Sequence, residues 1–259
     1  MTIKVAVLGR GRMGQELERC IAEADDLSLS GVWVRSHAAN NNDSQSVHSD
    51  NLSTVLSSAQ VAIDFTLPKV TESIIKAAVN AKIPLVCGVS GLPASVHQLM
   101  VSASAEIPIL HDRNMSPGIA VLQQLVQLVG STLGDEFEVE IHETHHVHKI
   151  DAPSGTALQL GEGLASSRKQ VFDEVYHYDP SGESRPAKGQ IQFGVTRHAE
   201  VPGEHTVLFK GALESLSLMH KVDNRRVFAM GALTAARWLI GQQPGLYNMP
   251  DLIRSSTLL

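Results

Sequence analysis

The sequence predicts an α/β protein in two parts: an N-terminal, doubly wound parallel sheet and a second, α+β domain with a mixed open sheet. In the first part, short β-branched runs alternate with helix-length segments, the pattern of a parallel sheet covered by helices on both faces. After Ser116 the pattern changes to a long amphipathic helix followed by alternating strands. The length of 259 residues also favours two domains, because single cores rarely exceed about 250 residues.

The first part opens with an apolar strand, Ile3 to Leu8, and the segments between the later strands carry apolar residues at helical spacing. Further strands are expected at Leu29–Val34, Val61–Phe65, Pro84–Cys87 and Ile107–Leu110. Crossover helices are expected at Met13–Ala24, Val70–Ala81 and Ala94–Ser104. The stretch Ala38–Asp50 is rich in Asn and Ser and is expected to be an exposed loop.

The second part begins with a helix, Ile119–Val129, and an alternating strand, Phe137–His142. A polar loop and a helix starting at Ser154 come next, and a Gly/Pro/Ser-rich connection covers Tyr178–Gly189. Later strands are expected at Ile191–Thr196, His205–Phe209 and Leu216–His220. The last apolar helix, Val227–Ile240, cannot be assigned to either part from its pattern.

Composition excludes several classes of partner. The net charge is −6 and there is no long basic run, which disfavours nucleic acid. The sequence has neither a basic leader with an apolar run nor a stretch approaching the roughly 20 apolar residues of a membrane helix. Cys20 and Cys87 form no C-x-x-C pair. We therefore expect a cytoplasmic protein without nucleic-acid or membrane partners.

A glycine motif follows the first strand: Gly9, Arg10, Gly11, Arg12, Met13 and Gly14. A G-x-G-x-x-G between a strand and a helix allows a tight turn and lets backbone N–H groups at the positive end of the helix approach a pyrophosphate. The motif alone is a weak signal, and a glycine turn that only packs helix against strand is the alternative. In its βαβ context it predicts a Rossmann-like, dinucleotide-binding domain.

The end of the second strand bears on the choice of dinucleotide. NAD-specific sites usually place an acidic residue there, whereas this chain has Arg35. Arg35, together with Arg10 or Arg12, would suit a 2′-phosphate. We therefore expect NADPH to bind at least as well as NADH, unless Arg35 is simply solvated.

Three other groups sit at the carboxyl ends of strands, where ligands of open α/β sheets gather. They are Asp64–Thr66, Gly88–Gly91 and Asp112–Met115. The small residues around Gly88, Val89 and Ser90 would let a nicotinamide approach the backbone closely. Each group alone is ordinary loop chemistry, so the prediction depends on their common edge.

The segment from His145 to Lys149 holds three histidines and a lysine, which is too polar for a core. Histidine titrates near neutral pH and can give a proton, while lysine can hold or protonate an anion. Ser154 is a good N-cap for a helix whose first amides, of Gly155 and Thr156, can hold a carboxylate. A general acid beside an anion site is what reduction of an acidic C=N or conjugated C=C substrate requires.

Two alternatives compete for this segment. His146 and His148 alternate along the chain and could ligate a metal with Glu143 or His142. No second ligand cluster follows downstream, so no metal is expected. The segment could also be a solvated charged loop.

On these residues the chain resembles the 4-hydroxy-tetrahydrodipicolinate (dihydrodipicolinate) reductase family over nearly its whole length. The His/Lys segment joined to Asp-Ala-Pro-Ser-Gly-Thr-Ala is highly specific, whereas the glycine loop is not. The segments that carry the resemblance are Gly11–Gly14, Ile63–Thr66, Asn114–Ser116, Glu143–Lys149, Asp151–Ala157, Gly203–Thr206 and His220–Lys221.

The resemblance implies NAD(P)H-dependent reduction of a cyclic imine dicarboxylate in lysine biosynthesis. It implies a dinucleotide domain of residues 1–116 with 226–259, and a substrate domain of residues 117–225 that forms a homotetramer through its sheet. It assigns the proton-donating acid to His145, a second donor to Lys149, and carboxylate binding to His146, Lys149, Gly155 and Thr156. Cofactor contacts would come from the glycine loop and from these residues: Gly88, Val89, Ser90, Asp112, Arg113, Asn114 and Met115.

The chain departs from the family pattern in three places. Its glycine loop is shorter, the acidic residue after the second strand is missing, and Val89 replaces a threonine. The competing functions are another two-domain dehydrogenase, which for aldehydes would need a cysteine nucleophile, and a non-catalytic NAD(P) sensor. Cys87 lies within an expected strand, which argues against the first.

Overall fold

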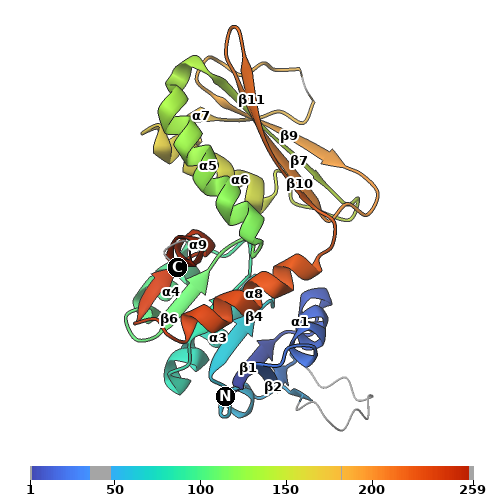
Figure 1. Ribbon diagram of the computed structural model, residues 1–259, viewed down its shortest axis with the longest axis vertical. Coiled ribbons are helices and arrows are strands. Elements are labelled where there is room, and N and C mark those ends of the chain that lie inside the picture. The colour runs from blue at the N-terminus through green and yellow to red at the C-terminus, as the bar shows by residue number, and fades with distance from the viewer. Residues whose placement is uncertain (1, 36–47, 182, 257–259) are drawn as a thin grey trace. The chain divides into compact units, whose positions relative to one another are not determined.

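The computed structural model describes residues 2–35, 48–181 and 183–256. The chain forms two compact units, Met1–Ser116 with Arg226–Leu259, and Pro117–Arg225 (Figure 1). The helix that the pattern left unassigned, α8, thus belongs to the first unit. The elements of the first unit are β1 Ile3–Leu8, α1 Arg12–Ala22, β2 Leu27–Trp33, β3 His48–Ser49, α2 Leu52–Leu56, β4 Val61–Asp64, α3 Pro68–Ala81, β5 Leu85–Cys87, α4 Ala94–Ala103, β6 Pro108–His111, α8 Arg226–Leu239, β12 Gly245–Tyr247 and α9 Met249–Ser256.

The sheet of the first unit is parallel and has the strand order β12-β6-β5-β4-β1-β2-β3. The order runs outward in both directions from the neighbours β1 and β4, so the chain reverses its winding between them. Open α/β sheets bind ligands at such a switch point, outside the carboxyl ends of the strands. The predicted doubly wound, Rossmann-like sheet is confirmed.

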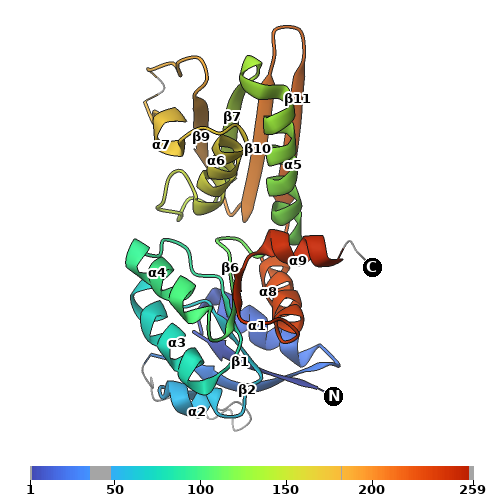
Figure 2. The same ribbon diagram turned by 90° about the vertical axis from the view of Figure 1, so that its left-hand side faces the viewer.

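Helices cover both faces of this sheet. Figure 2 shows α3 and α4 on one side and α1 and α8 on the other. The strands between them are buried on both faces: every residue from Val5 to Leu8 and from Val61 to Asp64 is inaccessible to solvent. This explains why their sequences read as continuous apolar runs instead of alternating ones.

Four short elements of the first unit were not expected from the sequence. β12 and α9 follow α8, and α2 precedes β4. β3 pairs with Val32 and Trp33 of β2, so the expected exposed loop was wrong at its end, because two residues are enough to extend an edge by main-chain pairing. Residues 38–47 of that loop lie outside the described residues.

The second unit is an open mixed sheet with helices on one face. Its elements are α5 Pro117–Leu133, the 3₁₀ turn η1 Gly134–Glu136, β7 Glu138–His145, α6 Gly155–Ser167, α7 Phe172–Val175, β8 Tyr176–Tyr178, β9 Ile191–Arg197, β10 Gly203–Lys210 and β11 Ser215–Val222. The strand order is β11-β10-β7-β9-β8. β7 is parallel to β9 and antiparallel to β10, which confirms the predicted mixed sheet.

In this unit α5 and α6 pack on one face of the sheet, as Figures 1 and 2 show. The core between them and the strands includes Ile141, Leu164, Phe193 and Val207. α6 approaches the sheet closely because residue 161 is glycine: a Cβ there would lie 2.5 Å from the Phe193 ring. β7 alternates strictly, so its odd-numbered residues face the helices and its even-numbered residues face the other side.

β7 continues to His145, three residues past the expected end at His142. The extension is stabilised on both sides, because Glu143 and Thr144 pair with β10 and also with β9. Because these residues are polar, their sequence does not indicate a strand, although buried and less buried positions still alternate up to His145. Among the described residues, no helix is long and apolar enough to cross a membrane.

Candidate functional site

The glycine loop after β1 divides its glycines between packing and open space. Gly9 has a φ of +96°, which favours glycine, and a Cβ on Gly14 would lie 1.9 Å from the carbonyl oxygen of Gly9. These two positions therefore need glycine for the turn itself. A Cβ on Gly11 would meet no atom within 4 Å. Gly11 is thus free to border a ligand at the N-terminus of α1.

A cavity of about 400 Å³ opens beside this loop. Its walls come from the carboxyl ends of β1, β2 and β4, the edge at which the sequence predicted a dinucleotide. Arg35 lines it, while Arg10 pairs with Glu18 at 3.3 Å. The lining residues are Gly9, Arg10, Gly11, Trp33, Val34, Arg35, Phe65, Thr66, Leu67 and Val70.

The loop after β5 is held from below. The side chain of Val89 is buried, and its carbonyl oxygen accepts a hydrogen bond from Nε2 of His111 at 3.1 Å. Gly88 lies against the Phe65 ring, where a Cβ would come within 2.4 Å of a ring carbon. Ser90 is exposed. The His111 hydrogen bond and the Phe65 contact therefore hold the backbone of this loop.

In the loop after β6, the acidic residue Asp112 makes hydrogen bonds within the protein. The carboxylate of Asp112 accepts hydrogen bonds from the amides of Asn114 and Met249, at 3.2 Å each. Met115 is buried, and Arg113 is half-buried. Asp112 thus ties this loop to α9, so a contact with a cofactor would have to come from its neighbours or from the backbone.

A second buried acid, Asp64, ends β4. Its carboxylate accepts a hydrogen bond from the amide of Thr66 at 2.8 Å. Burial raises the pKa of Asp64 from its usual 3.8 to about 6, against the lowering effect of the Thr66 hydrogen bonds. Asp64 therefore shapes the turn that carries Phe65 and Thr66 into the cavity wall.

In the second unit, His145 ends β7 with its ring on the helix-facing side. The residue is 8% exposed. Nδ1 of His145 hydrogen-bonds Glu143, which lies two residues earlier on the same face of the strand and is inaccessible to solvent. Beside the other nitrogen, Nε2, residue 203 is glycine, and a Cβ there would approach to 3.1 Å.

Glu143 is surrounded by donors. Besides His145, its carboxylate accepts the amide of Ser154 at 3.1 Å and Nη2 of Arg197 at 3.0 Å. Burial by itself would raise the pKa of Glu143, but the hydrogen bonds and charges of His145 and Arg197 prevail and lower it to about 2. The group is therefore a carboxylate at neutral pH.

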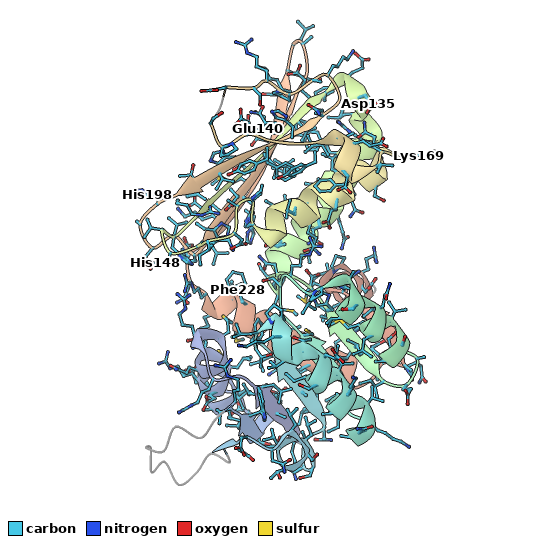
Figure 3. All side chains as sticks on the ribbon, turned by 180° about the vertical axis from the view of Figure 1, so that it is seen from behind. Asp135, Glu140, His148, Lys169, His198 and Phe228 are labelled. Carbon is cyan, nitrogen blue, oxygen red and sulfur yellow. The ribbon has the colours of Figure 1, made fainter. Side chains whose placement is uncertain are left out.

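Arg197, at the end of β9, fastens the loop that carries Lys149. Nε of Arg197 donates to the carbonyl oxygen of Lys149 at 3.2 Å, and Nη2 donates to that of Asp151. The ammonium group of Lys149 is largely shielded and pairs with the Asp151 carboxylate at 2.9 Å. Figure 3 shows His148 and His198 in the loops that follow β7 and β9, at the same end of the sheet.

The helix α6 starts at this end. Its N-cap, Ser154, accepts a hydrogen bond from the amide of Ala157 at 3.2 Å, as predicted from the sequence. Gly155 and Thr156 form the first turn, whose amides make the positive end of the helix. His146 is half-buried in the preceding loop, with its ring 6.1 Å from that of His148.

A further histidine, His205 of β10, completes the cluster. Its ring lies 5.1 Å from the His145 ring at 76°, and Nε2 is 3.4 Å from Oγ of Ser154. Burial, together with the charge of His145, lowers the pKa of His205 to about 3, so this imidazole is neutral. It makes a T-shaped contact with the His145 ring.

The second unit thus brings together His145, Lys149, Ser154, Gly155 and Thr156 at one end of its sheet. The residue types alone do not reveal that Glu143 contacts His145 and Arg197, and in the sequence Glu143 stands out only as a possible metal ligand. The signal for Glu143 was its i, i+2 spacing from His145, which the misplaced strand end concealed. Within the described part of the chain, no group of three or more His, Cys, Asp or Glu is arranged to hold a metal ion.

Comparisons with known proteins agree along the whole chain. Residues 3–115 match the family model "Dihydrodipicolinate reductase, N-terminus", and residues 118–253 match "Dihydrodipicolinate reductase, C-terminus". The 4-hydroxy-tetrahydrodipicolinate reductase of Pseudoalteromonas translucida is 38% identical over 96% of this chain and 97% of its own length. That of Pelobacter propionicus is 37% identical over 97% and 98%.

Solved structures share the fold. A dipicolinate-bound dihydrodipicolinate reductase from Paenisporosarcina sp. TG-14 superposes with a TM-score of 0.76 at 22% identity, covering 96% of this chain and 98% of the other. The diaminopimelate (DAP) dehydrogenase of C. glutamicum, in complex with DAP, has a TM-score of 0.60 at 15% identity, covering 98% and 96%. Both family models and the identity to full-length relatives lead to one conclusion: the chain belongs to the dihydrodipicolinate reductase family.

Proposed function

We propose that this protein reduces the cyclic imine 4-hydroxy-tetrahydrodipicolinate to tetrahydrodipicolinate with NADPH or NADH, a step of diaminopimelate and lysine biosynthesis in the cytoplasm. The observation that carries the proposal is the arrangement of side chains at one end of the second sheet. There a buried histidine, a lysine and the positive end of α6 lie together. The related proteins named above are reductases of this substrate.

The first unit is the proposed dinucleotide domain. The open space at Gly11 and the cavity of about 400 Å³ fit a pyrophosphate and an adenosine ribose, and Arg35 fits a 2′-phosphate. The glycine loop, Arg35 and the backbones of residues 88–90 and 112–115 would hold the dinucleotide, which supplies the hydride when bound. Arg12, exposed at the start of α1, offers a second cation.

The second unit is the proposed substrate domain. His146, Lys149 and the amides of Gly155 and Thr156 would bind the two carboxylates. Nε2 of His145 would give a proton to the ring carbon next to the one that receives the hydride. Lys149, 22% exposed at its side chain, would stabilise the anion and can replace the proton.

We also propose a homotetramer formed through this sheet. Helices α5 and α6 cover one face, and no described element of the unit covers the other (Figure 1). That face presents charged and apolar side chains, among them the exposed Lys210 and the largely exposed Met219, while the half-buried Leu208 lines a pocket with Pro186 and Ala187 of the loop after β8. Sedimentation analysis should give four times the monomer mass, and a stable monomer would rule this assembly out.

Oxidation of NADPH in the presence of the substrate, followed by absorbance, tests the function. Pyridine-2,6-dicarboxylate, a planar mimic of the substrate, should inhibit competitively and should bind to the His145 end of the second unit. A protein that binds NADPH but never oxidises it in response to the substrate would instead be a non-catalytic sensor.

A further inference from the structure

The buried carboxylate of Glu143 is not used in the proposed binding of either ligand, yet it contacts the proposed acid. Burying a charge is costly unless it is paired and hydrogen-bonded, so a fully buried Glu requires an explanation. An apolar residue would suit its neighbours Ile141 and Val139, which face the same core. The chain instead keeps a carboxylate there and satisfies it from three sides.

Those contacts determine the state of the His145 ring. A carboxylate is only an acceptor, and Nδ1 of His145 hydrogen-bonds it, so the proton of the neutral imidazole must be on Nδ1. Nε2 is then the nitrogen that takes and gives the second proton. The Glu143 hydrogen bond and the T-shaped contact with His205 orient the ring, and Gly203 has no side chain to crowd Nε2.

The same carboxylate connects the acid to the other groups of the site. One oxygen accepts the amide of Ser154, the N-cap of the helix whose first turn would hold a substrate carboxylate. It also accepts Arg197, whose guanidinium fixes the loop that carries Lys149. A single buried group therefore sets the positions of the proton donor, the anion-binding amides and the lysine.

We propose that Glu143, held by Arg197 and the Ser154 amide, is a positioning residue that fixes the tautomer and the orientation of His145 for proton donation from Nε2. The inference rests on the proposed function of His145 as the acid. Glu143 itself neither gains nor loses a proton: after Nε2 gives its proton to the substrate carbon, the imidazole remains neutral with its proton on Nδ1.

The test variant is Glu143→Gln, which keeps the size of the side chain. An amide has one acceptor and one donor end. With its oxygen facing Ser154 and Arg197, its NH₂ faces Nδ1, which must then accept, and the proton moves to Nε2. Replacing the orienting carboxylate by its amide lowers kcat by about 10⁴-fold in the serine-protease triad. We expect a loss of at least about 10²-fold in kcat here, the low end for general acid catalysis.

Glu140→Gln is the matched control. Glu140 lies on the opposite face of the same strand and also stands two residues before a histidine, His142, at 4.0 Å. Because Glu140 lies on the face proposed for assembly, sedimentation must first show the wild-type mass, and kcat should then stay within about twofold, the range expected away from the site. Glu143→Asp keeps the charge and should restore part of kcat. The affinity for NADPH should be unchanged in all three variants, because these residues lie outside the first unit.

A double-mutant cycle separates positioning from a structural role. If Glu143 acts through the imidazole, Glu143→Gln should add almost nothing to the loss caused by His145→Ala. Multiplied losses would overturn the proposal. ¹⁵N NMR of His145 in the resting protein should show Nδ1 protonated in the wild type and Nε2 protonated in Glu143→Gln. A wild type whose neutral His145 carries its proton on Nε2 would also overturn the proposal. This NMR test needs no turnover, so it can be read even if the proposed function fails.

Discussion

An added methyl group should have different effects at two glycines of the same loop: it should lower stability at Gly14 and cofactor affinity at Gly11. In Gly14→Ala the new Cβ would lie 1.9 Å from the Gly9 carbonyl oxygen, so the turn must shift by more than 1 Å to reach ordinary contact. Overpacking of this kind costs about 1–3 kcal/mol. In a unit of this size, each kcal/mol lowers Tm by about 2–4 °C, so Gly14→Ala should melt about 2–12 °C lower.

Gly11→Ala should leave the fold intact and lower the affinity for the cofactor. No atom lies within 4 Å of its Cβ, and the φ of −74° is accessible to alanine. Its stability should therefore stay within about 1 kcal/mol of the wild type. A methyl group between the loop and a pyrophosphate should raise Kd for NADPH at least about tenfold, or about 1.4 kcal/mol.

The assay is thermal unfolding with and without NADPH, followed by tryptophan fluorescence. Both tryptophans, Trp33 and Trp238, lie in the first unit, so the signal reports on that unit. A ligand at about 100 times its Kd adds about 2.7 kcal/mol, and a tenfold weaker ligand adds about 1.4 kcal/mol. Gly11→Ala should thus lose about half of the NADPH-induced rise in Tm. A full rise in Gly11→Ala, or a wild-type Tm in Gly14→Ala, would refute this division of roles.

Three other predictions follow from the same geometry. Arg35→Ala should lower the affinity for NADPH at least about fivefold, equivalent to about 1 kcal/mol, and leave the affinity for NADH unchanged in parallel titrations. If the variant and the wild type bind NADPH equally well, Arg35 does not contact the 2′-phosphate. His145→Ala should lower kcat by about 10²- to 10⁴-fold with Kd for NADPH unchanged, and a near-normal kcat in stopped-flow turnover would end its assignment as the acid. Because the folded pKa of Asp64 is raised to about 6, its ionisation destabilises the first unit as pH rises from about 4 to 6, by about 3 kcal/mol in total. Asp64→Asn should abolish that slope in fluorescence-detected denaturant titrations, whereas a persisting slope would assign it to other groups.

Much of this protein can be predicted from the sequence because its local signals agree with its fold. The apolar runs of β1 and β4 are continuous because both faces of the sheet are covered, and that composition shows in the sequence. The glycine loop lies where the strand-to-helix pattern puts it, and Ser154 caps α6 as its residue type implies. These features depend on neighbours within a few residues.

The short edge elements were not predictable in the same way. β3 has two residues, and β12 has three, so neither contains enough alternation to be recognised. Each exists because a longer strand, β2 or β6, offers its main chain for pairing. Partners far apart in sequence decide such elements.

The proposed acid site shows the same division. The sequence by itself was enough to select the candidate residues, because His145, Lys149 and the start of α6 fall within a dozen residues and their types suit a proton donor beside an anion site. Only the tertiary structure decided how they are held. Arg197 reaches Glu143 from a strand 54 residues away, and His205 reaches Ser154 across 51 residues. Strand pairing brings these groups into contact, and the energetic effect of a buried charge depends on the partners that surround it.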